Sequence, residues 1–215
     1  MHPDFEKNGF LIARNFFNET TVRLMQSYFN IKLTSINYNE EERSKHGFTT
    51  IEDGDVTTSF TYYADHLVES ISLNHGQKIS TLLGLNLSPT YSFARIYEKG
   101  SRLIPHTDRP SCEISVTCPV LTYNNTPSTI FISNVIRKDN EPNQFSIEEI
   151  HKRGGYTQVD LYPGDVLFYK GCERYHWRDK LESDYLIQFF MHFVQSDGLS
   201  TEWIYDKRPF VGFQH

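Results

Sequence analysis

Cysteine is scarce in this chain, which has three in 215 residues. An odd and sparse count cannot supply a disulfide framework, so the small disulfide-stapled secreted folds are excluded. We expect Cys112, Cys118 and Cys172 to be free, buried thiols that pack as small hydrophobic groups. Cys112 and Cys118 are expected to share one face of a strand.

Long apolar runs and an excess of basic charge are also missing. No stretch of about 18 apolar residues is present, and no charged segment followed by an apolar one opens the chain. The 21 lysines and arginines are outnumbered by 27 acidic residues, which gives a net charge of −6. This balance argues against a broad basic surface for nucleic acid or anionic lipid. We therefore expect a cytoplasmic protein with no nucleic-acid or membrane partner.

The length suits one domain. A chain of 215 residues with 38% hydrophobic residues can bury a sizeable core, and no internal repeat or low-complexity tract is visible. We expect a single domain over residues 1–215, with an N-terminal helical part (1–88), a β core (89–197) and a C-terminal tail (198–215). The tail is expected to cap the core or to join a dimer interface, so monomer and homodimer both stay open.

The N-terminal part shows helical periodicity twice. Residues 19–33 carry apolar side chains at helical spacing after Asn18, a plausible N-cap, and a second helix is expected from about Tyr63 to Leu83, ending at Gly84. Both should pack on the outside of the β core. The polar stretch 37–59 between them is expected to be a solvated loop or a lid over a site.

The second half of the chain reads as β structure. From Tyr91 to Val194, short runs rich in β-branched and aromatic residues alternate with turn signals, as in Val159–Tyr169 with its central Pro-Gly-Asp. The polar excursion 134–155 is expected to insert between two strands and to shape access to a site. This pattern favours an all-β sandwich or barrel.

His106-Thr107-Asp108 and a distant His176 are the residues that point to chemistry. Two imidazoles and one carboxylate can hold Fe(II) on one triangular face and leave the other positions open. On an extended strand, positions i and i+2 project to the same side, so His106 and Asp108 could reach one ion, and Pro105 is typical of a strand's end or edge. A bare His-x-Asp also arises by chance, and these residues alone leave that alternative open.

Four segments around these residues resemble a known family. The segments are Asp4–Ile12, Arg95–Gly100, Pro105–Pro110, and Pro163–Asp165 ahead of His176. Their order is similar to that of the iron- and 2-oxoglutarate-dependent dioxygenases of the prolyl-4-hydroxylase-like group. The resemblance implies a mainly β fold, a double-stranded β-helix (jelly roll) with the N-terminal helices packed on one sheet.

The resemblance also implies an activity. His106, Asp108 and His176 would be the iron ligands and catalytic centre, 2-oxoglutarate the cosubstrate and O2 the oxidant. The enzyme would oxidise a small molecule or a peptide side chain and release succinate and CO2. Asp108 favours hydroxylation, because related halogenases lack this carboxylate.

The cosubstrate's distal carboxylate usually meets a basic residue some nine to fifteen positions after the second histidine. This chain departs from that pattern, because Tyr185–Met191 contains no basic side chain. The leading candidate anchor is Arg178, which would share the inward face of His176; its alternative is a surface ion pair with Asp179 or Glu182. Further cofactor-binding candidates are Tyr97, Arg95, Gln188 and Arg109.

Two other functions remain open. One is a metal-binding jelly-roll protein of the cupin type without turnover, and the other is an interaction module whose histidines never meet. The remaining histidines considered, namely His66, His75, His151 and His192, are expected to be ordinary, partly buried side chains rather than ligands.

Overall fold

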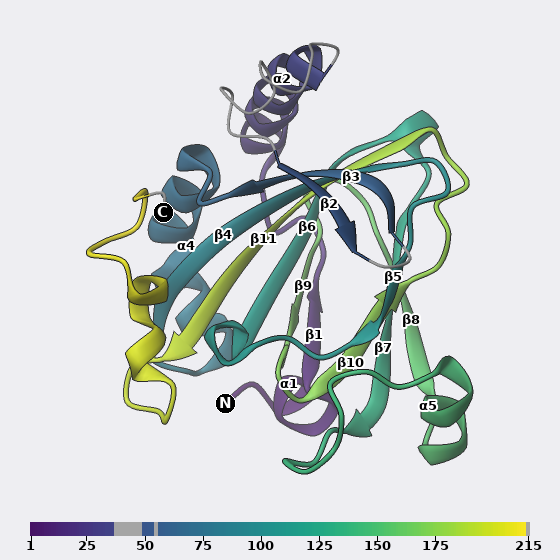
Figure 1. Cartoon of the computed structure of the whole chain (residues 1–215). Helices are drawn as coiled ribbons and strands as arrows, with labels where there is room; N and C mark the ends of the chain where they lie inside the picture. The colour runs from purple at the N-terminus through teal and green to yellow at the C-terminus, as the bar shows by residue number, and fades with distance from the viewer. Residues whose placement is uncertain (37–48, 54–55, 214–215) are drawn as a thin grey trace.

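Two antiparallel sheets face each other, and the three candidate ligands of the sequence analysis lie between them (Figure 1). The structure, a computed structural model, describes residues 1–36, 49–53 and 56–213. The larger sheet has seven strands in the order β1-β9-β6-β11-β4-β3-β2, and the smaller has four in the order β5-β10-β7-β8. Consecutive strands alternate between the two sheets through much of the chain, as in a double-stranded β-helix. The expected mainly β fold is confirmed.

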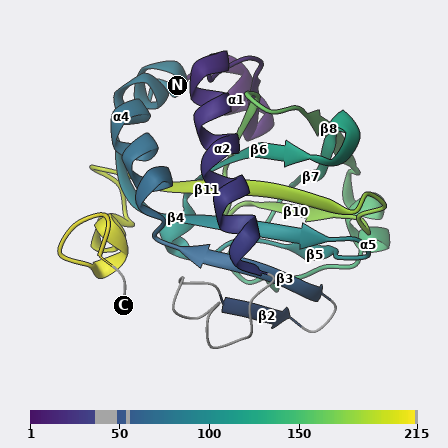
Figure 2. The same cartoon turned by 90° about the horizontal axis from the view of Figure 1, so that it is seen from above.

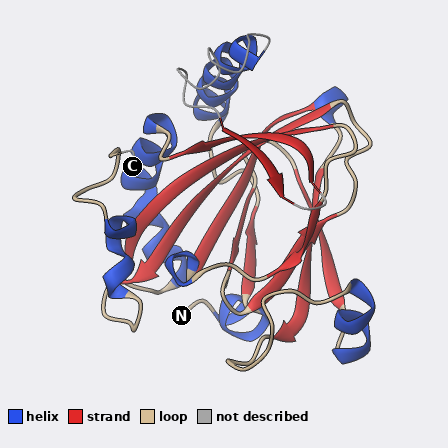
Figure 3. Cartoon of the chain, viewed as in Figure 1, coloured by secondary structure: helices blue, strands red, loops and turns tan. Residues whose placement is uncertain are grey.

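The strands and helices have the following bounds. The strands are β1 (Phe10–Ala13), β2 (Thr49–Asp53), β3 (Val56–Tyr63), β4 (Leu87–Glu98), β5 (Leu103–His106), β6 (Ile114–Thr122), β7 (Ser128–Ile136), β8 (Tyr156–Leu161), β9 (Val166–Tyr169), β10 (Arg174–Arg178) and β11 (Tyr185–Gln195). The helices are α1 (Pro3–Asn8), α2 (Glu19–Ile36), α4 (His66–Leu83) and α5 (Ile147–Arg153), with short 3-10 turns η1 (Pro110–Cys112), η2 (Tyr123–Asn125) and η3 (Thr201–Lys207). Figure 3 shows how strands dominate the described chain.

The two long helices cover the outer face of the larger sheet, as expected (Figure 2). Asn18 accepts a hydrogen bond from Thr21 N at 2.9 Å, which confirms it as the cap of α2. The second helix begins at His66 rather than at Tyr63, because Tyr63 pairs with Phe93 in the sheet and Asp65 caps the helix. Gly84 ends it in the left-handed conformation, with φ of 65°.

The N-terminal part is less helical than the sequence indicated. It contributes β1, β2 and β3 to the seven-stranded sheet, and β2 and the first half of β3 lie within the stretch 37–59 that was expected to be a loop. β-branched and aromatic residues in β3 favour a pleated surface, and pairing with β4 outweighs the polar character of the stretch. Residues 37–48, the rest of the expected loop or lid, lie outside the described residues.

The excursion 134–155 does insert between two strands, β7 and β8. Its first residues extend β7 to Ile136, and its last part forms α5, which Ser146 caps by accepting from Glu149 N. Between these elements, Asn143 and Gln144 reach the cavity described below. The insertion therefore shapes that cavity, as expected.

The cysteines form no disulfide. Cys112 and Cys118 are buried and Cys172 is half-buried. Cys112 lies in η1, just before β6, so the expected shared strand face with Cys118 is wrong: the chain turns at Pro110 before the strand begins. No helix among the described residues is both long enough and apolar enough to span a bilayer.

A buried ion pair ties the C-terminal tail to the core. Arg208 Nη2 lies 2.7 Å from Glu69 Oε1 of α4, and both side chains are at most 3% exposed. Arg208 also donates to the carbonyl oxygens of Thr90, Tyr205 and Phe213. The tail thus packs on the end of the barrel, where η3 contacts β4.

Removing Arg208 should destabilise the protein strongly. In Arg208→Ala, the buried carboxyl group of Glu69 loses its ion-pair partner, which costs about 3 kcal/mol or more. Urea denaturation of this variant and of Arg23→Ala measures the difference. Arg23 pairs with Glu19 on the exposed surface of α2, so its loss should change the free energy of unfolding by less than about 0.5 kcal/mol. Equal losses in the two variants would contradict a structural role for the buried pair.

Candidate metal and cosubstrate site

His106 and His176 lie directly opposite each other on adjacent antiparallel strands. Their Nδ1 atoms lie 2.9 Å from Ile104 O and 3.0 Å from Arg174 O. A carbonyl oxygen only accepts, so each Nδ1 carries the hydrogen and each Nε2 of the neutral ring keeps a free lone pair. Both Nε2 atoms face Asp108. The edge position of β5, which Pro105 indicated, is confirmed.

Asp108 completes the group from a loop. Its Oδ1 lies 3.6 Å from His106 Nε2 and 3.4 Å from His176 Nε2. The strand β5 ends at His106, so the argument that His106 and Asp108 alternate on one strand is wrong. Asp108 N instead donates to Gly171 O at 2.9 Å, which holds the loop against the segment before β10.

Gly171 is required by this packing. A Cβ atom there would lie 2.4 Å from Asp108 Oδ2 and 2.5 Å from Cys112 O. Both distances are far below a van der Waals contact. Only glycine lets the loop place the carboxylate beside the two imidazoles.

The three groups perturb one another electrically. Burial alone would raise the pKa of Asp108, but His176 and His106 outweigh it and hold that pKa well below its usual value. Burial alone would lower the pKa of His106, but the hydrogen bond to Asp108 and its charge raise it. The carboxylate is therefore ionised, and a divalent cation can replace the proton shared with the imidazoles.

The donor set fits a divalent transition metal. Each of the three residues offers one ligand atom, and these atoms lie within 4.8 Å of one another. Two nitrogen donors and one carboxylate oxygen on one wall of a cavity form the type of site that binds non-haem Fe(II) and leaves positions open. The structure thus brings together the three residues that the sequence singled out.

A second group, Asp108, Cys112 and His192, also meets this distance limit. Burial, and next the charge of Asp108, raise the pKa of the Cys112 thiol well above its usual value. A thiol must ionise to bind a metal, so this group is the poorer site.

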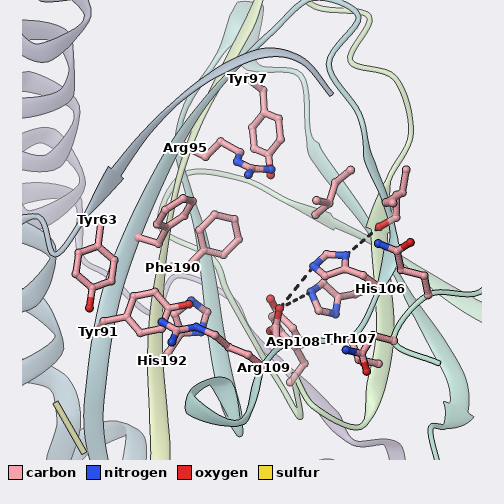
Figure 4. A pocket seen from close by; sticks show the side chains of 17 residues that line it. Tyr63, Tyr91, Arg95, Tyr97, His106, Thr107, Asp108, Arg109, Phe190 and His192 are labelled. Atoms are coloured by element: carbon pink, nitrogen blue, oxygen red, sulfur yellow. Dashed lines mark hydrogen bonds and ion pairs between the residues drawn. The ribbon is translucent and has the colours of Figure 1, made fainter. Parts of the chain in front are cut away.

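The three residues line a cavity of about 510 Å³ between the sheets. Arg95 and Tyr97 project into one end of it, and Tyr63, Tyr91 and His192 gather at the other (Figure 4). The remaining lining residues are Phe93, Leu103, Ile104, Thr107, Arg109, Asn143, Gln144, Tyr169 and Phe190.

Arg95 brings an uncompensated positive charge to this cavity. It is 7% exposed, and its guanidinium makes no hydrogen bond or ion pair with any residue that the structure describes. Its Nε is buried without a partner. The guanidinium lies over the rings of Tyr97 and Phe93, 5.5 Å and 5.8 Å from their centroids. A buried cation without a counterion is costly, so this end of the cavity suits an anion.

Arg178 points inward between the sheets, so the alternative of a surface ion pair is wrong. It does not line the cavity. Its Nη1 donates to Thr129 O and its Nη2 to Gln188 Oε1 at 2.6 Å, while its Nε has no partner among the described residues. Gln188 in turn donates to Thr117 Oγ1. Arg178 and Gln188 form a network behind the wall to which Arg95 and Tyr97 belong.

Arg109 lies at the aromatic end of the cavity. Its Nη2 donates to Asp206 Oδ2 at 2.7 Å, and its guanidinium lies over the Tyr91 ring at 4.5 Å. Its charge is therefore already paired, unlike that of Arg95.

Sequence reasoning missed His192 and Ser115. Ser115 Oγ lies 2.8 Å from Asp108 Oδ2 and 3.0 Å from His192 Nδ1, so both residues connect to the candidate metal site through Asp108. A signal in the sequence could have found His192. Side chains two positions apart on a strand lie on the same face, so His192 on β11 shares a face with Phe190 and Gln188. His75 was also expected to be an ordinary histidine. Its ring packs on that of Phe17, with the ring centroids 5.0 Å apart, and it lies outside the cavity.

Comparison with known proteins shows the fold. No model of a protein family matches the chain, and no curated protein matches it in sequence. Solved structures do match: the non-heme alpha-ketoglutarate-dependent epimerase SnoN from nogalamycin biosynthesis has a TM-score of 0.65 at 10% identity, over 89% of this chain and 80% of that one. A Pseudomonas putida prolyl-4-hydroxylase has a TM-score of 0.61 at 12% identity, over 88% and 94%. HygX from Streptomyces hygroscopicus, with nickel and 2-oxoglutarate bound, has a TM-score of 0.58 at 13% identity, over 90% of this chain and 85% of that one.

These likenesses establish that the chain has the fold of the 2-oxoglutarate-dependent oxygenases, including the prolyl-4-hydroxylase-like arrangement. At such identities they do not carry a reaction or a substrate. An epimerase and a hydroxylase share the fold, so the outcome of the reaction depends on the site.

His192 should make stability depend on pH. Burial lowers its pKa to about 4, below the 6.5 of a free imidazole. Between these values the unfolded chain binds a proton that the folded protein does not, so stability is present above pH 6.5 and is lost as the pH falls toward 4. The loss is at most about 3 kcal/mol, at ~1.4 kcal/mol per pH unit.

Thermal denaturation of the wild type and His192→Asn from pH 7 to pH 4.5 measures this effect. The variant should lose less stability over the range. Parallel curves for the two proteins would show that His192 is not buried in the neutral form.

Proposed function

We propose that this protein is a non-haem Fe(II)- and 2-oxoglutarate-dependent dioxygenase. The observation that carries the proposal is the convergence of His106, Asp108 and His176 on one wall of a cavity that also holds the unpaired Arg95. The fold shared with 2-oxoglutarate-dependent oxygenases supports it.

In this proposal, His106 Nε2, His176 Nε2 and Asp108 Oδ1 hold Fe(II). When bound, Fe(II) supplies the chemistry that couples the conversion of 2-oxoglutarate to succinate and CO2 with oxidation of a substrate by O2. The protein fixes the ligand atoms in advance, because backbone carbonyls orient both rings and Ser115 donates to Asp108 Oδ2.

Arg95 anchors the distal carboxylate of 2-oxoglutarate. Its guanidinium can give parallel N–H donors to a carboxylate, and no acidic side chain among the described residues competes for it. Tyr97 lies beside it on β4. Arg178 and Gln188 support this wall from behind, so the structure favours Arg95 over Arg178, reversing the order that the sequence indicated.

The substrate is a small molecule or a peptide side chain that reaches the aromatic end of the cavity. We propose hydroxylation, because Asp108 supplies the carboxylate that related halogenases lack. The cupin-type alternative, metal binding without turnover, has the same ligands, and succinate release distinguishes the two.

Loss of any ligand should abolish metal binding. His106→Ala, Asp108→Ala and His176→Ala each remove one of three donors, so the affinity for Fe(II) should fall by more than the roughly 100-fold that follows loss of a residue that merely orients a ligand. Anaerobic titration with Fe(II) and 2-oxoglutarate, followed by the weak visible charge-transfer band, measures this.

His151→Ala is the control, because His151 lies on α5 away from the cavity. It should titrate like the wild type. A band that persists in His106→Ala would place the iron elsewhere.

Arg95→Gln should weaken 2-oxoglutarate binding and leave Fe(II) binding intact. Loss of a charge-assisted pair lowers affinity by about 10- to 100-fold. Isothermal titration of the Mn(II)-loaded protein with 2-oxoglutarate measures this, with Arg178→Gln as the matched comparison. A larger effect in a folded Arg178→Gln variant would return the anchor to Arg178.

A further inference from the structure

The end of the cavity away from Arg95 has a continuous aromatic wall. Tyr63 stacks on Tyr91 with ring centroids 5.2 Å apart, and Tyr91 lies 4.5 Å from the His192 ring. Phe190 stacks on His192 at 6.3 Å and lies 6.4 Å from Phe93. We call Tyr63, Tyr91, Phe190 and His192 the aromatic lobe, and Figure 4 shows them across the cavity from His106. Phe93 lies between this lobe and Arg95, whose guanidinium is 5.8 Å from the Phe93 ring.

The described cations beside the aromatic lobe are paired. Asp206 Oδ2 accepts from Arg109 at 2.7 Å and from Tyr63 Oη at 2.6 Å. Arg208, whose guanidinium lies 5.2 Å from the centre of the Tyr63 ring, is paired with Glu69. Burial raises the pKa of both Tyr63 and Tyr91 above the usual value, which keeps their hydroxyls protonated. A charged ligand group would find no uncompensated partner here, in contrast to the Arg95 end.

One polar atom in the aromatic lobe has no partner. Ser115 has a single hydroxyl hydrogen, and it donates that hydrogen to Asp108 Oδ2, 2.8 Å away. A competing contact to Cys112 O is longer, at 3.4 Å. Ser115 Oγ must therefore accept from His192 Nδ1, 3.0 Å away, so Nδ1 carries the ring hydrogen and Nε2 carries a lone pair.

The His192 ring stays neutral because burial disfavours its protonation. Its Nε2 makes no hydrogen bond with any described residue, and His192 lines the cavity. An acceptor that lines a cavity and receives no hydrogen bond from a described residue is free to accept one from a ligand, so this nitrogen is a recognition point.

We propose that the aromatic lobe is the subsite of the primary substrate, and that it takes an uncharged ring compound which donates an O–H or N–H to His192 Nε2. The assignment to a substrate rests on the proposed function, whereas the binding preference does not. Stacking on Tyr91 and Phe190 would orient the ring, and the hydrogen bond would select its donor group.

His192→Asn separates the two hydrogen-bonding roles of the histidine, donation to Ser115 and acceptance from a ligand. The amide nitrogen of asparagine can take the place of Nδ1 and keep the donation to Ser115, whereas the acceptor at Nε2 is lost. His75→Asn is the matched control, because His75 is a partly buried histidine that contacts aromatic rings outside the cavity.

The experiment uses the full chain loaded with Ni(II) and 2-oxoglutarate. Binding of phenol, cyclohexanol, anisole and benzoate is measured by ligand-observed NMR. The two hydroxyl probes offer a donor on an aromatic or a saturated ring, anisole offers none, and benzoate is charged. At least one hydroxyl probe should bind about tenfold more tightly than anisole and benzoate, and His192→Asn should bring it to the level of anisole. His75→Asn should keep the preference.

The proposal is overturned when neither hydroxyl probe binds more tightly than anisole, when benzoate binds best, or when His192→Asn keeps the preference. The same samples report Ni(II) and 2-oxoglutarate binding. If the protein binds neither Ni(II) nor 2-oxoglutarate but still prefers a hydroxyl probe, the result would count against the proposed dioxygenase. The binding preference of the aromatic lobe would still be supported.

Discussion

The position of one carboxylate determines the rest of this site. Asp108 Oδ1 faces two imidazole nitrogens, and Oδ2 accepts from Ser115, so each oxygen has a separate partner. The arrangement depends on Gly171, since any side chain there would collide with Oδ2. An ionised carboxylate buried in this way is stable only beside groups that carry or accept positive charge. The same electrostatic demand makes the site receptive to a divalent cation.

Charge pairing divides the cavity into two ends. Among the described residues, the buried Arg208 is paired with Glu69, and the exposed Arg109 is paired with Asp206. The buried Arg174 and Arg178 donate to neutral oxygen atoms away from the cavity. Arg95 is an exception that faces the cavity, and the free energy of its unpaired charge is recovered only when an anion binds. In the proposed enzyme, a dianionic cosubstrate would therefore bind at the Arg95 end of the cavity and an uncharged substrate at the aromatic lobe, without a conformational change. Specificity here follows from which charges the fold leaves unpaired.

Strand alternation and turn residues are local signals, so the sequence alone indicated a mainly β fold. The resemblance to the 2-oxoglutarate-dependent dioxygenases supplied the jelly roll and the three candidate ligands. Sequence reasoning failed where tertiary contacts decide. Asp108 lies beyond the strand that was expected to carry it, and β2 and β3 replace part of an expected loop because β4 offers an edge to pair with. Arg178 was correctly placed on the inward face, but only the packing shows that Gln188 and Thr129 occupy its donors. His192 looked ordinary because nothing local marks a histidine that bonds to a serine 77 positions away.

The link from Asp108 through Ser115 to His192 joins the proposed metal ligands to the end of the cavity where we propose that the substrate binds. A single hydroxyl hydrogen sets the direction of both hydrogen bonds, so ionisation of the carboxylate determines which nitrogen of His192 accepts from a ligand. If Asp108 were neutral, Ser115 could reverse and the recognition nitrogen would become a donor. In the proposed enzyme, a carboxylate at Asp108 therefore has a second consequence besides holding the metal: it keeps His192 Nε2 an acceptor that an uncharged O–H or N–H group can use.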